Sequence, residues 1–434
     1  MTPEVIGGIG FVVLFILMAA GIPLGASMGI VGFFGLGAIL SFHVAWVKFA
    51  QAPFEFVTNY SFAALPLFLV MGQVIVSSGQ GKEIFKCART LLGRLPGGLA
   101  IAAVVGCAIF GSVSGSAIAT AVTIGMVAIP QMLEYKYEPG LATGSCAAGG
   151  TLGTLIPPSG VLMMYGIITE NSIAKLFIGG IIPGIICTGL YALVIYTRCR
   201  INPGLGPAGE KTTFREKITS TKDIWEIFVL GILCIGGLLV GFFTATEAGA
   251  IGAAGAFVLA GVKGRLTKRV LKNIVRESGK SIGMIYAVLL GAYLFNYFCA
   301  ASRLPQNLSD WVAGLHLGAV YVMIVIIVIY IVMGALADEI SVQLITTPIF
   351  YPIIVKGLGF DPIWFGVMQA RLLQIGMIAP PVGLVVFVIR GLFKQISMTT
   401  IYRGVLWFLL ADVVSLALFM AWPKLILFLP DLMK

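Results

Sequence analysis

The stretch "GTLIPPSG" at residues 153–160 interrupts an apolar segment, and the related stretch "GMIAPPVG" stands in the second half of the chain at residues 376–383. In both stretches a pair of prolines begins four residues after a glycine. The offset in numbering between Gly153 and Gly376 also separates Gly111 from Gly334, upstream of the two stretches. A shared offset at several such residues indicates an internal duplication.

The composition around these motifs is that of a membrane protein. The chain has 434 residues, of which 59% are hydrophobic and 11% charged, whereas roughly a quarter of the residues of a soluble domain are charged. Apolar runs of about 20 residues, the length that crosses a bilayer, recur throughout. We therefore expect an all-α polytopic membrane protein. The first apolar run is expected to remain as a span, because no basic region of a signal peptide precedes it.

The duplication divides the chain into a first repeat at 1–197 and a second at 226–434, joined by a cytoplasmic linker at 198–225. Each repeat is expected to contain one re-entrant hairpin, at 99–130 and 317–356, and one broken helix, at 139–168 and 362–389. The other spans are expected near 4–22, 24–42, 57–78 and 174–197, and near 226–243, 245–262, 281–300 and 404–428.

Charge placement agrees with this arrangement. A re-entrant hairpin returns to the side from which it enters, so each repeat has five true spans. Because five is an odd number, the second repeat is expected to be inverted in the membrane. Seventeen of the 28 lysines and arginines lie in three stretches, 81–94, 198–222 and 263–280. This topology places all three on the cytoplasmic side, as the positive-inside rule requires. The loops expected on the opposite side, 43–56 and 301–316, contain one basic residue each, Lys48 and Arg303, counting lysine and arginine. The basic stretches before residues 99 and 281 are amphipathic and are expected to lie on the membrane surface.

The first hairpin carries hydroxyl groups at its expected tip, "GSVSGSAIAT" at residues 111–120. Gly115 permits unusual dihedral angles, while Ser112, Ser114 and Ser116 offer oxygen atoms and helix caps. Together with the carbonyl groups that the prolines release from helical bonding, these oxygens suit a hard cation such as sodium. The alternative is that the small residues only allow close helix packing.

The second hairpin carries two acids, Asp338 and Glu339, at its expected tip. Ionisable residues inside membrane segments usually mark ion or proton paths; the alternative is that both acids are solvated at a wet tip. Arg371 either pairs with an acid or contacts substrate, Asp412 is expected to pair or to reach the membrane surface, and Glu247 either caps a helix or takes part in transport.

Matched broken helices indicate a secondary transporter, whose site lies near the midplane between the repeats. A channel would not require them. No enzyme is indicated, because "SSGQGKE" and "SGKS" lack the upstream glycine of a P-loop and "GSVSG" lacks the serine of a nucleophile elbow. The net charge of +10 reflects membrane topology and not nucleic-acid binding.

The sequence resembles the large membrane subunit of TRAP transporters, the tripartite ATP-independent periplasmic family. The matching segments run in order along nearly the whole chain: "GSVSGSAIATAVTIGMVAIPQM", "GTLIPPSG", "TATEAGA", "MGALADEISVQLITTPIFYPII", "GFDPIWFGV" and "IGMIAPPVGLVVFV". The resemblance implies a multi-pass transporter of the bacterial inner membrane that works as an elevator. It also implies two or more coupling sodium ions, no organic cofactor, a small four-helix membrane subunit and a periplasmic substrate-binding protein. The implied substrate is an organic acid such as a C4-dicarboxylate, sialic acid or keto acid.

The resemblance also implies where sodium and substrate bind. The first sodium site would use, largely through carbonyl groups, Ser112, Ser114, Gly115, Gly153, Ile156 and Pro157. The second would use Gly334, Gly376, Ala379 and Val382. Substrate would sit between the hairpin tips, near Ser116, Thr154 and Asp338. The family usually has threonine where this chain has Ala379, so the second sodium site is expected to depend on carbonyl groups. A stand-alone ion-coupled carboxylate symporter or an ion antiporter of similar architecture is the alternative function.

Overall fold

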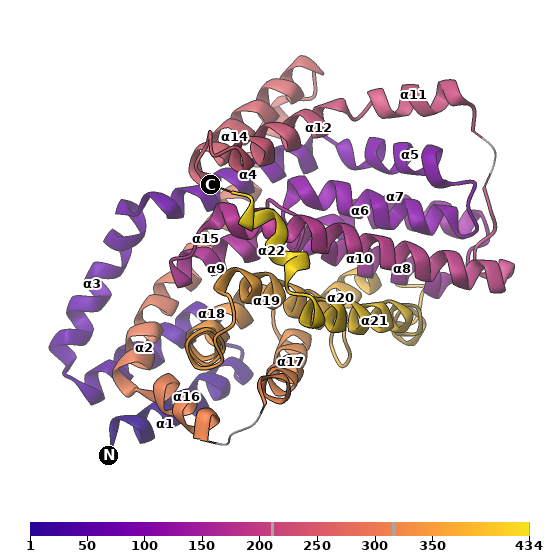
Figure 1. The fold of residues 1–434 in the computed structure, drawn as a ribbon. Helices are drawn as coiled ribbons and strands as arrows, with labels where there is room; N and C mark the ends of the chain where they lie inside the picture. Colours follow the sequence, from indigo (N-terminus) through magenta and orange to yellow (C-terminus); the bar gives the residue numbers. More distant parts are fainter. Residues whose placement is uncertain (210–211, 315–317, 434) are drawn as a thin grey trace.

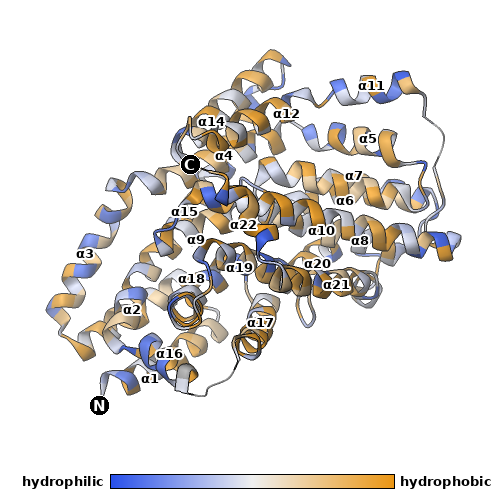
Figure 2. Ribbon diagram, in the orientation of Figure 1, coloured by the Kyte–Doolittle hydropathy of each residue, from blue (hydrophilic) through white to orange (hydrophobic). Residues whose placement is uncertain are grey.

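The computed structural model describes residues 1–209, 212–314 and 318–433, and these residues form helices and connections without a strand (Figure 1). Among them, eight helices are long and apolar enough to cross a membrane. The expected all-α polytopic architecture is confirmed. Apolar residues run along most helices, whereas the short helix α11 (Phe214–Lys222) is largely hydrophilic (Figure 2).

The helices before the linker include one that the sequence did not predict, α3. They are α1 (Pro3–Ala19), α2 (Leu24–Ile39), α3 (Phe42–Thr58), α4 (Ala64–Ser77), α5 (Gln80–Leu92), α6 (Gly98–Ser114), α7 (Ala117–Glu134), α8 (Pro139–Thr151), α9 (Gly160–Thr169) and α10 (Ile173–Ile201). The pair α6–α7 forms a helical hairpin, and α8 and α9 are the two parts of an interrupted helix.

The helices after α11 repeat this order. They are α12 (Trp225–Gly231), α13 (Gly237–Leu239), α14 (Ala245–Val262), α15 (Lys268–Ser302), α16 (Leu304–Gly314), α17 (Ala319–Leu336), α18 (Glu339–Tyr351), α19 (Pro362–Gly376), α20 (Leu384–Leu392), α21 (Met398–Ala421) and α22 (Lys424–Asp431). The pair α17–α18 forms the second hairpin, and α19 and α20 form the second interrupted helix. The inversion of the second repeat in the membrane stays a prediction.

Two packed groups of helices result, which we call the outer group (α1–α4, α14 and α15) and the inner group (α6–α10 and α17–α22). Figure 1 shows α1, α2 and α3 together at one side of the molecule and α6, α7, α8 and α10 side by side at the other. Glycines allow the closest crossings in each group. A Cβ atom on Gly291 of α15 would lie 1.9 Å from the carbonyl oxygen of Gly25, and one on Gly404 of α21 would lie 1.9 Å from that of Gly140. Only small residues permit such approach between helices.

Three expectations for the connections were wrong. The expected loop 43–56 is helix α3, which starts after the N-cap Ser41 and is held by aromatic contacts such as Phe33–Trp46, with ring centroids 5.0 Å apart. Most of the described part of the expected loop 301–316 is helix α16. The basic stretch before residue 281 is not a separate surface helix, because α15 continues through it as one helix of 35 residues. Long charged side chains are compatible with continuous helix, so polarity alone does not mark its end.

The linker between the halves is fastened to the base of the first hairpin by Tyr137, which lies in the connection between α7 and α8, outside the spans. Its hydroxyl donates to the Pro207 carbonyl oxygen (2.8 Å) and accepts from the Leu99 amide (3.2 Å). Burial raises the pKa of Tyr137 from 10.0 to about 12. The stability that this clamp contributes is therefore present below pH 10 and is lost as the pH rises from 10 to about 12.

In a Tyr137→Phe variant we expect the linker to be cut by protease about thirtyfold faster at neutral pH, because two hydrogen bonds of about 1 kcal/mol each are lost. Limited proteolysis followed by mass spectrometry measures this rate. The matched control is Tyr135→Phe, since Tyr135 is exposed. Equal cleavage of both variants at neutral pH would show that Tyr137 does not hold the linker.

Candidate functional site

The first hairpin turns over within two residues. Helix α6 ends at Ser114, and Gly115 follows with a φ of 62°, a left-handed conformation that glycine adopts without steric cost. Ser116 then caps α7 by accepting from the amide three residues on (3.4 Å). The hydroxyl groups of Ser114 and Thr120 lie 2.8 Å apart across the turn. The tip is therefore polar and closely fixed within an apolar protein.

The prolines of the first interruption release two carbonyl groups from helical bonding, and one of the two finds no donor among the described residues. Pro157 and Pro158 have no amide hydrogen, so the carbonyl groups four residues before them, at Gly153 and Thr154, lose their helical donors. The Thr154 carbonyl instead accepts from the Ser159 hydroxyl. Among the described residues, no donor reaches the carbonyl oxygen of Gly153. A buried oxygen of this kind is a suitable ligand for a hard cation.

Each hairpin meets its interrupted helix through a pair of glycines. A Cβ atom on Gly111 would lie 2.6 Å from the Cα atom of Gly153, and one on Gly376 would lie 2.6 Å from the Cα atom of Gly334. These are equivalent positions of the two repeats. The backbones are therefore in direct contact at both places, and neither contact leaves room for a side chain.

The second hairpin turns at Asp338, which caps α18. Its carboxylate accepts from the Ser341 amide (3.0 Å) and from the Ser341 hydroxyl. The amide of Gly383, at the end of the second interruption, donates to the Ala335 carbonyl oxygen (3.2 Å). This second tip is thus tied to its interruption by a backbone hydrogen bond as well as by the glycine contact.

The second interruption differs from the first because its released carbonyl groups find partners. The Gly376 carbonyl oxygen accepts from the Ala379 amide (3.2 Å), and the Met377 carbonyl oxygen accepts from the Val385 amide (3.1 Å). A carbonyl oxygen has two lone pairs, so these groups keep some capacity to bind a cation. They are nevertheless less available than the Gly153 oxygen.

Tyr402 of α21 adds a further contact at the second interruption. Its hydroxyl lies 2.6 Å from the Val382 carbonyl oxygen and 3.0 Å from that of Pro381. The offset between the two repeats makes Gly179 the equivalent position of the first repeat, and glycine has no hydroxyl. The second interruption is therefore held by a side chain from another helix, and no equivalent tyrosine stands at the first.

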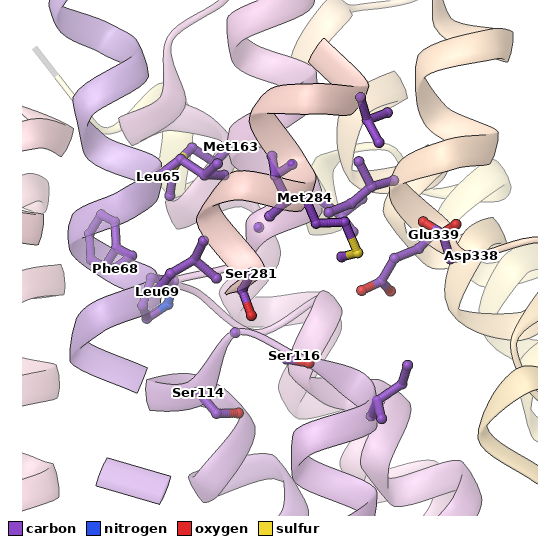
Figure 3. A pocket seen from close by; sticks show the side chains of 18 of the residues that line it. Leu65, Phe68, Leu69, Ser114, Ser116, Met163, Ser281, Met284, Asp338 and Glu339 are labelled. Atoms are coloured by element: carbon purple, nitrogen blue, oxygen red, sulfur yellow. The ribbon is translucent and has the colours of Figure 1, made fainter. Parts of the chain in front are cut away.

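A cavity of about 330 Å³ lies between the two tips and the outer group (Figure 3). The tips contribute Ser114, Gly115, Ser116, Asp338 and Glu339, and the start of α9 contributes Gly160. The outer group contributes apolar side chains of α4 and α15, together with Ser281. The cavity is thus enclosed by both hairpins, by both interruptions (Pro158 of the first and Met377 of the second) and by two helices of the outer group.

The structure places the predicted site residues in three settings. Ser114, Gly115, Ser116 and Asp338 line the cavity. Gly153, Gly334 and Gly376 lie behind it at the glycine contacts. The described lining does not include the remaining predicted residues, Ser112, Thr154, Ile156, Pro157, Ala379 and Val382. The hydroxyl groups of Ser112 and Thr154 donate to nearby helix carbonyl groups, at 2.7 and 2.9 Å.

Sequence reasoning missed the contributions of Ser281 and Tyr402. Ser281 sits in a basic stretch that merges into a span, and Tyr402 lies near the start of a span. Neither position has a motif, so only the folded arrangement reveals them. Met284, a flexible side chain on the same face of α15 as Ser281, also lines the cavity (Figure 3).

Arg371 pairs with an acid and does not line the cavity. Its guanidinium lies 2.5 Å from the Asp412 carboxylate and donates to the Ser415 hydroxyl, and the Tyr191 hydroxyl donates to Asp412 (2.6 Å). Arg371 and Asp412 are both completely buried. This cluster joins α19, α21 and α10 inside the inner group. Glu247 forms a capping box with Thr244 at the start of α14, which agrees with the capping alternative.

The contact between the inner and outer groups is apolar. Among the described residues, no hydrogen bond or ion pair joins α1–α4, α14 or α15 to α6–α10 or α17–α22. Within each group such bonds are present, as between Gln343 of α18 and the Val161 carbonyl oxygen of α9 (2.9 Å). The cavity lies at the boundary of two groups that are bonded internally but share no hydrogen bond or ion pair with each other among the described residues.

Comparison with known proteins identifies the family. The family model of the tripartite ATP-independent periplasmic transporter, DctM component, matches residues 11–425. The C4-dicarboxylate TRAP transporter large permease protein DctM of Pseudomonas aeruginosa is 33% identical over 359 residues, which cover 82% of this chain and 83% of that one. Its namesake from Rhodobacter capsulatus is 31% identical over 439 residues, 98% of each chain. The sialic acid TRAP transporter large permease protein SiaM of Vibrio cholerae is 30% identical over 418 residues, 96% of each chain.

A solved structure has a similar fold. The YdaH transporter of Alcanivorax borkumensis matches with a TM-score of 0.61 over 89% of this chain and 91% of that one, at 16% sequence identity. This likeness concerns the fold alone. Because the family model matches nearly the whole chain, the protein belongs to the tripartite ATP-independent periplasmic transporter family as its DctM component, a multi-pass transport protein of the bacterial inner membrane and not an enzyme.

Proposed function

We propose that this protein takes up an organic acid by sodium-coupled secondary transport, with the cavity between the hairpin tips as its solute site. The observation that carries the proposal is the position of this cavity at the apolar boundary between the inner and outer groups. A solute held by the two tips would cross the membrane when the inner group slides along the outer group. Among the described residues no hydrogen bond or ion pair joins the two groups, so such sliding would not have to break one.

Sodium coupling is supported by the unpaired carbonyl oxygen of Gly153 at the first interruption. We propose that a sodium ion binds to this oxygen at the first interruption. Further oxygen ligands would come from Ser112, Ser114, Gly115, Ile156 and Pro157. A second sodium ion would bind at Gly334, Gly376, Ala379 and Val382. Because the released carbonyl groups of Gly376 and Met377 already accept hydrogen bonds from backbone amides, we expect the second ion to bind more weakly than the first.

The substrate class and partners are proposed from the family and the relatives. The relatives named above carry C4-dicarboxylate and sialic acid in their names, and a C4-dicarboxylate, sialic acid or keto acid is our proposed class. We also propose that a periplasmic binding protein delivers the substrate and that a small four-helix membrane subunit completes the transporter.

Uptake into proteoliposomes tests this function. We expect a labelled acid to accumulate only with an inward sodium gradient, the binding protein and the small subunit, while a potassium gradient of equal size has no effect. Uptake without the binding protein and small subunit would favour the alternative of a stand-alone carboxylate symporter. Uptake that ignores sodium would contradict the coupling.

The clamp at the second interruption gives a separate prediction. In a Tyr402→Phe variant we expect the apparent sodium affinity of uptake to fall about three- to tenfold, because the Val382 and Pro381 carbonyl groups lose the hydroxyl that fixes them. The sodium dependence of the uptake rate measures this. Tyr196→Phe is the control, since Tyr196 is exposed on α10. An unchanged sodium dependence in the Tyr402 variant would exclude a role of this clamp in ion binding.

A further inference from the structure

The charges around the cavity do not match a simple anion. Its described lining contains two carboxylates, Asp338 and Glu339, and no lysine, arginine or histidine. An organic acid in this cavity would place its own carboxylate near these two acids, and like charges at short distance repel each other. The following inference rests on the proposed sodium-coupled transport of an organic acid, and it replaces the substrate class taken from the relatives' names by one argued from the cavity itself.

The first-half side of the cavity is nevertheless suited to a carboxylate. Helix α7 begins after Ser116 and α9 begins at Gly160, so two helix N-termini open at the cavity wall. Their amide groups and dipoles favour negative charge. The hydroxyl groups of Ser114 and Ser116 lie on this side as well, apart from the acids of the second tip (Figure 3).

The two acids of the second tip differ in their hydrogen bonding. Asp338 is occupied as the cap of α18 through its hydrogen bonds from Ser341. The Oε2 atom of Glu339 is enclosed and has no hydrogen-bond partner among the described residues. An enclosed carboxylate oxygen without a donor is costly. Among the described residues, Oε2 of Glu339 therefore has no cation or hydrogen-bond donor beside it. Because Glu339 lines the cavity, a solute bound there could supply that partner.

We propose that the transported acid is a zwitterion, with its carboxylate held at the helix N-termini of the first half and a cationic nitrogen paired with Glu339. The cavity then has one pole for each charge, and its apolar walls from α4 and α15 accommodate the carbon skeleton. A volume of about 330 Å³ suits a small aminocarboxylic acid or a methylated ammonium acid. A nitrogen cation would satisfy Glu339, which an organic dianion could not.

Matched ligand pairs test this proposal on the purified full-length chain in sodium-containing buffer. Each pair replaces the charged nitrogen by carbon: glycine betaine against tert-butylacetate, β-alanine against butyrate, and γ-aminobutyrate against pentanoate, with succinate as a dianion. Ligand-dependent thermal stabilisation gives apparent affinities. We expect at least one zwitterion to bind about tenfold or more tightly than its carbon counterpart, as a charge-assisted pair requires.

The variant Glu339→Gln should bring this ratio close to one, chiefly by weakening the zwitterion. The control is Glu134→Gln, because Glu134 is an exposed acid at the other end of α7. The comparison within each pair uses the wild-type protein, so it stands even if the Glu339 variant fails to fold. An unchanged ratio in a folded Glu339 variant would overturn the pairing.

The remaining outcomes are also decisive. Sodium-dependent binding of succinate or of the carbon counterparts in preference to every zwitterion would overturn the zwitterion inference and leave the proposed organic-acid transport standing. Binding of neither class would count against this inference, whereas the transport function would then fail only if proteoliposome uptake also failed.

Discussion

In a Gly111→Ala variant we expect sodium-driven uptake to fall by about ten- to a hundredfold. The added Cβ atom would lie 2.6 Å from the Cα atom and 3.0 Å from the amide nitrogen of Gly153. Both are backbone atoms and cannot rotate away, so the first hairpin and the first interruption must separate. Such overpacking costs about 1–3 kcal/mol, and it displaces the carbonyl oxygen that we assign to sodium.

The control for this prediction lies on the same helix. A Cβ atom on Gly106 would meet no atom closer than 3.8 Å, so Gly106→Ala adds a methyl group to α6 without a clash. We expect its uptake to remain near that of the wild type. The amount of folded protein in the membrane must be measured for both variants. Normal uptake by a folded Gly111→Ala protein would show that the glycine contact is not needed for transport.

In an Arg371→Met variant we expect the free energy of unfolding to fall by about 3–5 kcal/mol, since the buried carboxylate of Asp412 loses its ionic partner. The same loss is expected for Asp412→Leu, which leaves the guanidinium buried. The double variant Arg371→Met/Asp412→Leu should recover much of this loss, because no unpaired charge remains in the interior. Thermal unfolding of the purified proteins in detergent measures all three.

An exposed ion pair serves as the comparison. Lys86 and Asp223 lie 3.5 Å apart with side-chain exposures of 67% and 38%, and such pairs contribute about 0–1 kcal/mol. Lys86→Met should therefore hardly change unfolding. A double variant less stable than either single variant would contradict this explanation. The contribution of Arg371 and Asp412 to the packing of α19 and α21 would then not be due to their charges alone.

The duplication made the central part of this fold predictable. One common offset in numbering relates the paired prolines and the two glycines of each half, and each of these residue types constrains the backbone by itself. The sequence alone matches the glycines Gly111 and Gly153 with Gly334 and Gly376, and the structure contains both contacts. Prediction works at such positions because proline removes a donor and glycine permits contact wherever they occur.

Other parts depend on contacts between segments that are distant in the sequence. Helix α3 was expected to be a loop because its apolar and polar residues do not form a bilayer-length run, and its aromatic packing with α2 decides its structure. Ser281 reaches the cavity only because α15 packs beside both tips. Tyr402 reaches the Val382 carbonyl group across 20 residues of chain. The unpaired state of Glu339 likewise depends on what surrounds it in space.

Sodium binding by the purified chain is the most direct test of the proposed ion-coupled site. Isothermal titration calorimetry in a sodium-free buffer without organic ammonium ions needs no knowledge of the substrate. We expect saturable binding of sodium that equal concentrations of potassium do not reproduce, and we expect the Gly111→Ala variant to lose the tighter of two phases while Gly106→Ala keeps it. Equal heats for sodium and potassium, or unchanged sodium binding in a folded Gly111→Ala protein, would contradict the assignment of sodium to the first interruption.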